Sequence, residues 1–456
     1  MRPNILFLMS DEHRADVAGF AGDPVVRTPV LDELARTGVV FANAYTPSPI
    51  CVPGRQCLMS GQLPRTCGCE GWTDLPAGHM TFARQFRRHA YAAVCCGKLH
   101  HQGEDQMQGW TARPAGDMRV SPARVDDLVA EEAQRYQRPF GDFKWSDAKE
   151  VKRAGVGRSH VLVDDEAWTE AALRTVDEHF NSAQYDREQT NPLLLKLSLL
   201  APHYPYQTDA ERFGYYLNRV RPYLGQEPSA HPFLGRRQVR PGVDASEREL
   251  RRATAAYYGM VEGIDTQYGR VLERLEHVGQ DLDDWIVVYT SDHGEMLGEH
   301  GIWEKQKFYE GSARVPLVVR WPKGFDGGRV VSENVNLCDL FATLCELAGL
   351  PVPPGLDSRS LVPLLKGDGG GWDNETVSQF GRHNLMIKRD HLKYQYYGPD
   401  MPEVLFDLGA DPTERRDFVD DPAYAGALRD FRRRLGQLGH GPEADPAYAG
   451  AGYAAG

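Results

Sequence analysis

The sequence predicts an α/β fold in which a large, mixed but mostly parallel sheet is sandwiched by helices, followed by a smaller C-terminal α+β subdomain. Short leucine-rich or β-branched runs alternate with amphipathic stretches, a pattern typical of parallel α/β sheets. Beyond a glycine-rich segment at 367–371, shorter strand-like runs precede one helical stretch. We therefore expect a large domain over 1–366, the subdomain over 373–440 and a disordered tail over 441–456.

Individual elements follow from the spacing of apolar residues. Four buried strands of the large sheet are expected at 5–9, 92–95, 193–200 and 285–290. A long helix is expected over 255–278, where apolar residues share one face. In the subdomain we expect antiparallel strands at 384–397 and 404–408 and a helix near 423–435. The stretch 104–191 is charged and has few long apolar runs, so we expect surface insertions there.

Composition limits the classes of function. The 456 residues carry a formal net charge of −12, which repels nucleic acid and anionic membranes, so we expect neither as a partner. No run approaches the roughly 20 apolar residues of a membrane span. The apolar run at 5–9 is shorter than a signal-peptide core, and we expect a cytoplasmic protein. The eight cysteines lack zinc-finger spacing, and most are expected to be reduced core residues.

Each of the four predicted strands runs directly into a cluster of polar side chains. The clusters stand at 10–14, 97–100, 202–205 and 291–295. Ligands of open α/β sheets bind at the carboxyl ends of the strands, so parallel neighbours would bring these clusters together on one rim. The sequence therefore predicts a polar site built from carboxylates, imidazoles and a lysine.

Two of these strand ends supply predicted metal ligands, namely Asp11, Glu12, Asp292 and His293. Three carboxylates with one imidazole suit Ca²⁺, Mg²⁺ or Mn²⁺ better than zinc or copper. The alternative is that Asp11 and Asp292 only cap following helices, since aspartate is a favoured N-cap residue. The occurrence of both aspartates after buried strands at opposite ends of the domain favours a metal site.

The segment 49–56 carries the most specific pattern in the chain. Pro53 fits the first turn of a helix, which places Cys51 near a helix N-terminus, where backbone N–H groups favour anions. Arg55 lies four residues after Cys51 and therefore on the same helix face. A thiol phosphatase would need a longer loop between its cysteine and arginine. The remaining alternative is a buried structural cysteine.

With these motifs the chain resembles the sulfatase family, the formylglycine-dependent branch of the alkaline-phosphatase-like superfamily. The signature Cys-x-Pro-x-Arg stands at 51–55, Gly-Lys-x-His at 97–100, Pro-His-x-Pro at 202–205 and Asp-His-Gly-Glu-Met-Leu-Gly-Glu-His at 292–300. The pattern is closest to bacterial choline-sulfatase-like members. The resemblance implies the alkaline-phosphatase-like fold and hydrolysis of a sulfate monoester to an alcohol and inorganic sulfate.

In that family a maturation enzyme oxidises the cysteine to formylglycine, whose hydrate presents two hydroxyl groups. One hydroxyl attacks sulfur and releases the alcohol; the second then loses its proton, and collapse to the aldehyde expels sulfate. Serine lacks the second hydroxyl. The resemblance thus implies formylglycine at Cys51 and a formylglycine-generating enzyme as a partner.

The resemblance also assigns roles to individual residues. Asp11, Asp292 and His293, with the modified residue 51, would bind the metal, with calcium preferred over manganese or magnesium. Glu12 stands where many sulfatases have a second aspartate, and its longer carboxylate can still ligate. The expected catalytic set is Cys51 as nucleophile, Arg55 holding its hydrate, Lys98 and Lys305 on sulfate oxygens, His100 as the base for collapse and His203 as proton donor to the alcohol.

Rival functions remain open at this stage. The closest is a phosphonate monoester or phosphodiester hydrolase of the same superfamily, but that group lacks the element carrying Lys98 and His100. A non-catalytic binder of sulfated ligands would leave Cys51 unmodified, and the complete set of catalytic motifs disfavours it. The alcohol can be a carbohydrate, choline or an aryl group, and a homo-oligomer is compatible with the sequence.

Overall fold

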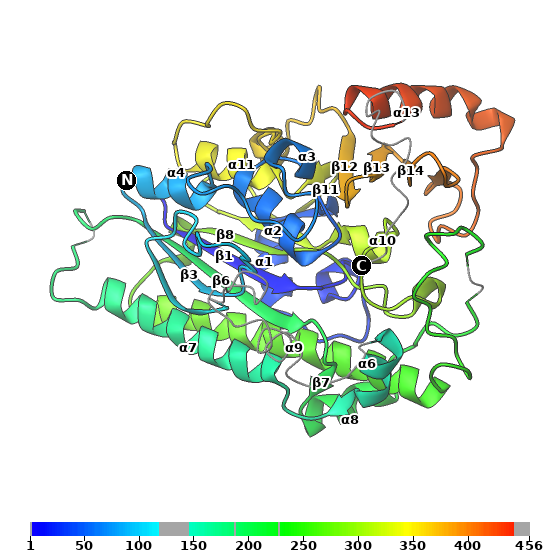
Figure 1. The fold of residues 1–456 in the computed structure, drawn as a ribbon. Helices are drawn as coiled ribbons and strands as arrows, with labels where there is room; N and C mark the ends of the chain where they lie inside the picture. The colour runs from blue at the N-terminus through cyan, green and yellow to red at the C-terminus, as the bar shows by residue number, and fades with distance from the viewer. Residues whose placement is uncertain (1, 118–145, 187, 227–228, 442–456) are drawn as a thin grey trace, which may run out of the picture.

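The computed structural model describes residues 2–117, 146–186, 188–226 and 229–441. Within them, a large mixed sheet lies between two layers of helices, and a smaller antiparallel sheet follows near the C-terminus (Figure 1). This arrangement confirms the predicted fold class. All but the first residue of the expected tail at 441–456, and the central part of the charged stretch, 118–145, lie outside the described residues.

The large sheet has the strand order β11-β2-β10-β8-β1-β6-β3-β4, with β9 paired to β2. Its strands are β1 (Ile5–Asp11), β2 (Val39–Tyr45), β3 (Ala92–Gly97), β4 (Ala112–Gly116), β6 (Leu193–Pro202), β8 (Ile286–Ser291), β9 (Arg314–Val315), β10 (Leu317–Arg320) and β11 (Arg329–Asn336). The four predicted strands are β1, β3, β6 and β8. They are adjacent and parallel, so the predicted meeting of their carboxyl ends is confirmed.

Helices cover both faces of this sheet. One face is covered by α1 (Pro29–Thr37), α6 (Asp147–Arg153), α7 (His160–Phe180), α8 (Ala210–Leu217) and α9 (Glu247–His277). The other is covered by α2 (Cys51–Ser60), α3 (Pro64–Cys67), α4 (Phe82–Arg88), α11 (Asp339–Leu347) and α12 (Val362–Leu365). The short α10 (Glu310–Ala313) and the two-stranded sheet of β5 (Gly155–Val156) and β7 (Gln207–Thr208) lie in the connections.

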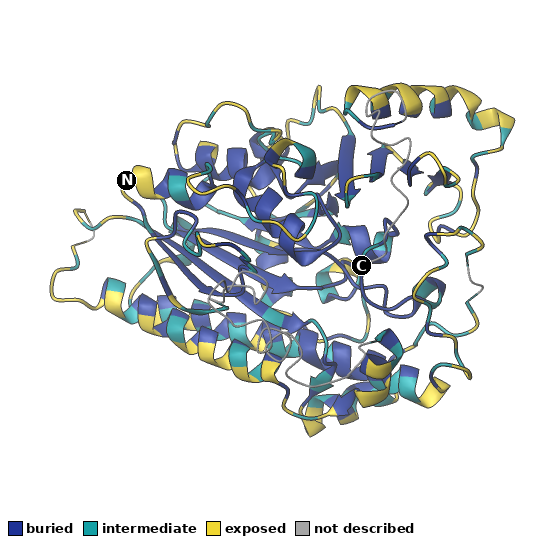
Figure 2. Ribbon diagram, in the orientation of Figure 1, coloured by how far each residue is buried: buried dark blue, intermediate teal, exposed yellow. Residues whose placement is uncertain are grey.

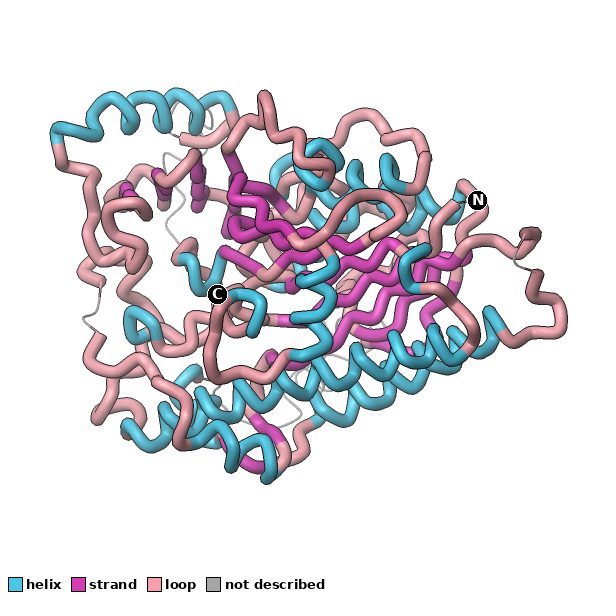
Figure 3. The backbone as a smooth tube through the Cα atoms, turned by 180° about the vertical axis from the view of Figure 1, so that it is seen from behind, coloured by secondary structure: helices cyan, strands magenta, loops and turns pink. Residues whose placement is uncertain are grey.

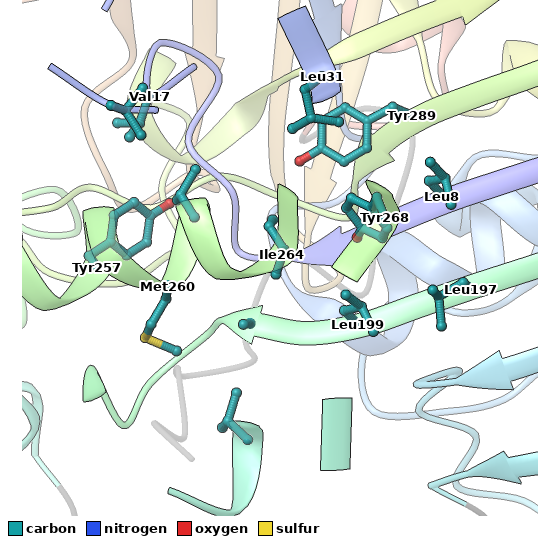
Figure 4. Packing of buried hydrophobic residues seen from close by; sticks show 14 of the residues in the cluster. Leu8, Val17, Leu31, Leu197, Leu199, Tyr257, Met260, Ile264, Tyr268 and Tyr289 are labelled. Atoms are coloured by element: carbon teal, nitrogen blue, oxygen red, sulfur yellow. The ribbon is translucent and has the colours of Figure 1, made fainter. Parts of the chain in front are cut away.

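Strand β1 shows why the layers form. Leu6 and Leu8 point into the core shared with α7 and α9, whereas Phe7 and Met9 point into the core shared with α2 and α4. Because both faces are covered, the strand is apolar at nearly every position, as in other buried parallel strands. Figure 2 shows the central strands of the sheet buried, and β1, β3, β6 and β8 are buried at nearly every position. Figure 4 shows Leu8 with side chains of β6 and α9 in the first of these cores.

Two expectations need correction. Helix α9 begins at Glu247, earlier than the apolar pattern indicated, because Ser246 and Glu249 form a capping box at its N-terminus. The second concerns 104–191, where surface insertions were expected: α7 is a core helix whose Trp168 and Val176 pack in the main hydrophobic cluster. Its opposite face is charged and exposed, and this masked the apolar stripe.

The small sheet consists of β12 (Glu375–Phe380), β13 (Asn384–Arg389), β14 (Leu392–Tyr396) and β15 (Val404–Asp407), all antiparallel, with α13 (Ala425–Gln437) packed on it. Strand β12 was not predicted. The other face of this sheet contacts α10, where Phe406 and Tyr309 share one cluster. Figure 3 shows from behind that α13 lies at the opposite end of the molecule from the N-terminus.

The described residues agree with two further expectations. All eight cysteines are buried and none is in a disulfide. Among the helices that the structure describes, none combines the length and hydrophobicity of a membrane span.

Candidate active site

The polar clusters meet at one edge of the large sheet. Asp11 is the last residue of β1, and Asp292 and His293 follow β8 directly. Lys98 follows β3, and its Nζ lies 2.5 Å from Asp11 Oδ2. His203 follows β6, with its Nε2 3.5 Å from the Glu12 carboxylate. The structure thus brings the predicted residues of all four strand ends into one site.

Cys51 is the first residue of α2 and lies at the centre of this site. The preceding Ile50 has extended backbone, so the helix starts at Cys51 itself. The Cys51 Sγ lies 3.1 Å from His293 Nε2 and 3.7 Å from both Asp11 Oδ1 and Lys98 Nζ. Burial, followed by the charge of Asp11, raises the pKa of Cys51 to about 12. The unmodified side chain is therefore a neutral thiol, which is a poor nucleophile.

Asp11, Cys51, Asp292 and His293 form a compact, buried set of potential metal ligands, with one atom of each within 4.8 Å of the others. His293 Nδ1 lies 3.0 Å from the Gly294 carbonyl oxygen, so Nδ1 carries the proton and the Nε2 lone pair faces the cluster. The Cys51 sulfur occupies the position that an oxygen of a modified side chain would take. Two carboxylates, one imidazole and such an oxygen fit a hard divalent cation.

Arg55 organises the two aspartates. Its Nε donates to Asp292 Oδ2 at 2.7 Å and its Nη2 to Asp11 Oδ2 at 2.9 Å, while Nη1 donates to the Lys98 carbonyl and the Ser198 hydroxyl. Burial opposes ionisation of Asp11, but Lys98 and Arg55 hold the pKa of this carboxyl well below its usual value. Its hydrogen bonds thus fix the carboxylates on either side of residue 51, and its expected contact with the hydrate of that residue stays a prediction.

Glu12 lies beside this cluster. Its Oε2 is 2.7 Å from Lys305 Nζ, and its Oε1 is buried and accepts no hydrogen bond from the described residues. Glu12, Asp11 and His203 form a second group of potential ligands. A positive φ of 68° at Glu12 turns the chain out of β1 and separates the directions of the two acidic side chains.

The two predicted proton-transfer histidines are both neutral. His203 Nδ1 lies 2.7 Å from the Tyr204 carbonyl oxygen, so it is the donor, and Nε2 accepts from Lys305 Nζ at 2.9 Å. Burial, then the charge of Lys305, lowers the pKa of His203. Burial, then Lys98, lowers the pKa of His100 to about 3. His100 can therefore accept a proton, whereas His203 must gain one at Nε2 before it can donate.

The comparisons with known proteins identify the family. A profile described as "Sulfatase" matches residues 3–350, and one described as "N-sulphoglucosamine sulphohydrolase, C-terminal" matches residues 298–440. The chain belongs to the sulfatase family. As a sulfatase it is a sulfuric ester hydrolase, which confirms the resemblance seen in the sequence motifs.

Relatives of this sulfatase include the choline-sulfatase of Rhizobium meliloti (strain 1021), 31% identical over 94% of this chain and 86% of that protein. The arylsulfatase of Clostridium perfringens (strain 13 / Type A) is 28% identical over 95% of this chain and 94% of that protein. Among solved structures, the phosphonate monoester hydrolase of Agrobacterium radiobacter aligns with a TM-score of 0.76 and 24% identity, covering 96% of this chain and 95% of that chain. The last similarity shows the shared fold.

Residue 54, the second variable position of the Cys-x-Pro-x-Arg pattern, is a glycine for a structural reason. A Cβ atom at this position would lie 2.8 Å from the Ser48 carbonyl oxygen and 3.4 Å from the Asp292 carbonyl oxygen. The first distance is shorter than a carbon–oxygen contact allows. The loop before α2 therefore packs so closely on the helix that no side chain fits at residue 54.

A cavity of about 390 Å³ opens above Cys51. The predicted residues Lys98, His100, His203 and Lys305 line it. The sequence reasoning missed the remainder of the wall, which includes Trp72, Arg153, His160, Arg237 and Glu304. These residues belong to no sulfatase motif and come from separate connections, so only the folded arrangement identifies them.

Proposed function

We propose that this sulfatase hydrolyses a sulfate monoester with a formylglycine made from Cys51 as its nucleophile and with one bound divalent metal ion. The observation that carries the proposal is the position of Cys51, at the start of α2 and within 4 Å of His293, Asp11 and Lys98. The neutral character of the unmodified thiol argues that the side chain must be modified before it acts.

Asp11, Asp292, His293 and residue 51 would hold the metal, and Glu12, from the neighbouring group that it forms with Asp11 and His203, would be a further ligand. Calcium is the preferred ion because oxygen donors predominate, and Mn²⁺ or Mg²⁺ are the alternatives. When bound, the ion supplies positive charge that stabilises developing negative charge on oxygen. Lys98 and Arg55 lower the pKa of Asp11 and keep it ionised, and Arg55 orients both Asp11 and Asp292 for this role.

The remaining roles concern sulfate and protons. Lys98 and Lys305 would contact the sulfate oxygens and offset charge in the transition state. His100, neutral and on the cavity wall, would take the proton that allows sulfate to leave. His203 would protonate the leaving alcohol through Nε2, because its Nδ1 is held by the Tyr204 carbonyl.

The proposal also covers the roles of the two domains, the maturation enzyme, the location, the oligomeric state and the ester. We assign catalysis to residues 1–366 and a supporting role to the subdomain at 373–440, whose Lys393 pairs with Glu310 at 2.8 Å. A formylglycine-generating enzyme, a cytoplasmic location and a homo-oligomer are expected as well. A carbohydrate sulfate, choline sulfate or an aryl sulfate would supply the ester.

The rival activity is phosphonate monoester or phosphodiester hydrolysis. Lys98 argues for the sulfate monoester, since its ammonium lies beside Asp11 and 3.7 Å from Cys51 Sγ, where a non-bridging sulfate oxygen would sit. The relatives named as choline-sulfatase and arylsulfatase support the same choice. A binder without catalysis would not need these groups around a nucleophile.

The test is to produce the chain with and without a formylglycine-generating enzyme and to examine the Cys51 peptide by mass spectrometry. We expect aryl sulfate turnover only where sulfur has been lost and an aldehyde gained, and faster turnover than with an aryl phosphate or a phosphonate monoester. Cys51→Ala should be inactive, whereas Cys345→Ala, a buried cysteine of α11, should remain active. Full activity with an intact thiol at residue 51 would refute the mechanism.

A further inference from the structure

The cavity wall beyond the catalytic residues is unusually basic for this chain. The protein carries a net charge of −12, yet Arg153 and Arg237 both line the cavity that leads to Cys51, as does His160 at the start of α7. Among the described residues that line the cavity, the single carboxylic acid is Glu304. It is only 2% exposed, and burial holds its pKa well above the usual value.

The two arginines are held in place from behind. Arg153 Nη2 lies 2.5 Å from Glu150, which is 1% exposed. Arg237 Nη2 lies 3.1 Å from Asp147, which is 7% exposed, and Nη1 donates to Gln306 at 2.7 Å. Both acids belong to α6, and neither lines the cavity. A bound ligand would therefore meet the guanidinium groups before these two carboxylates. A third acid, Glu304, lines the cavity itself and lies 3.9 Å from Arg237 Nη2.

Trp72 supplies an apolar surface at the same cavity. The indole is 56% exposed although it is a large aromatic residue, and its ring meets the His100 ring edge-on at 5.3 Å. An exposed indole beside a polar pocket can pack against the C–H face of a sugar ring. The second aromatic residue of the wall, Tyr204, already carries the Lys305 ammonium 4.9 Å from its ring centroid. A cationic ligand would meet this ammonium group rather than a cage of aromatic faces.

From this arrangement we propose that the natural substrate is a sulfated acidic sugar, whose ring packs on Trp72 and whose second anionic group binds Arg153 and Arg237. This inference rests on the proposed sulfatase mechanism and adds the nature of the alcohol. Arginine suits the task because its planar guanidinium binds a carboxylate or sulfate through paired hydrogen bonds. A choline ester would instead bring a positive charge toward two arginines.

The test compares kcat/KM of the formylglycine-containing enzyme on four esters. These are a sulfated glucuronic acid, a disulfated glucosamine, a monosulfated neutral glucose and choline sulfate, with 4-nitrophenyl sulfate as the reference. We expect at least one of the two sugars with a second anion to exceed the neutral sugar by about tenfold or more, and choline sulfate to be poorest. The first two esters distinguish a carboxylate from a second sulfate as the group recognised.

Substitutions of the two arginines test whether they cause the preference for a second anionic group. Arg153→Gln and Arg237→Gln should each reduce the acidic-to-neutral ratio by about tenfold, mainly through KM. The matched control is Arg433→Gln on α13, an arginine that also pairs with an acid three residues away, Asp430, far from Cys51 in sequence and outside the cavity lining. This control should leave the ratio unchanged. Arg153 is 44% exposed, so its variant should fold even if replacement of Arg237 disturbs the loop.

The outcomes separate the two proposals. Turnover of 4-nitrophenyl sulfate without a preference for a second anion, or a ratio that neither arginine variant alters, would overturn the acidic-sugar inference and leave the sulfatase mechanism intact. Absence of turnover on every ester, by protein whose formylglycine has been verified, would overturn the proposed function itself.

Discussion

Replacement of Arg55 by lysine tests how the two aspartates of the site are held. Lysine keeps the positive charge but is a point donor, whereas the guanidinium reaches Asp11, Asp292, the Lys98 carbonyl and Ser198 together. We expect Arg55→Lys to retain one carboxylate contact and to lose the other, together with both bonds to neutral acceptors.

The magnitude follows from these hydrogen bonds. A hydrogen bond to a charged group contributes about 1.5–3 kcal/mol and a neutral one about 0.5–1.5 kcal/mol. One charged and two neutral bonds therefore amount to about 2.5–6 kcal/mol, a large share of a typical stability of about 5–15 kcal/mol. Because Asp11 and Arg55 are fully buried, solvent screening does not reduce this loss.

The assay is urea unfolding of metal-free protein, in which a lower midpoint with an unchanged slope reports lost stability. Arg36→Lys is the control, since Arg36 pairs with Glu33 on the surface and its replacement should change stability by less than about 0.5 kcal/mol. A loss below about 1 kcal/mol for Arg55→Lys would refute the reasoning, because the carboxylates would then not depend on the guanidinium.

Three further outcomes are expected. Asp292→Asn should lower the calcium content measured by mass spectrometry of the metal-loaded protein, whereas Asp430→Asn on α13 should not; unchanged metal content would show that Asp292 is only a structural residue. His100→Ala should release about one equivalent of alcohol rapidly from an aryl sulfate and then stall, with turnover reduced about 10²–10⁴-fold; slow release without a burst would instead give His100 the first proton transfer. Burial lowers the pKa of His13 from 6.5 to about 4. Between these two pH values the unfolded chain therefore binds a proton at His13 that the folded chain does not. The free energy of unfolding should therefore fall as pH drops through this range, and His13→Gln should make the slope shallower by about one proton; an unchanged slope would mean that His13 is protonated in the folded state.

The sequence was sufficient for the centre of the fold. The runs that became β1, β3, β6 and β8 are apolar on both faces, and polar residues follow each of them, so their type and the site at their ends could both be predicted. Helix α7 could not be recognised in the same way, because its exposed face is charged and only tertiary packing reveals its apolar stripe.

Within the site, the sequence predicts which residues take part but not how their side chains are oriented. The motifs identified Cys51, Arg55 and Lys98 as site residues. The pairing of Arg55 with Asp11 and Asp292, however, depends on how α2 packs against the sheet. The same holds for Glu12, whose left-handed backbone turns its side chain toward Lys305. The basic wall with Arg153 has no local pattern, since its members come together only through long connections.

The burial of Cys51 has a consequence for the order of events in the life of the protein. Its side chain is 2% exposed and sits in the first turn of a formed helix, so the folded chain does not present residues 51–60 as an extended peptide. If the proposed maturation enzyme binds this segment as an extended peptide, it would have to act while the chain is still being synthesised or has not yet folded. A chain that folds before this step would keep Cys51 as an unmodified thiol and would be stable but inactive until it unfolds.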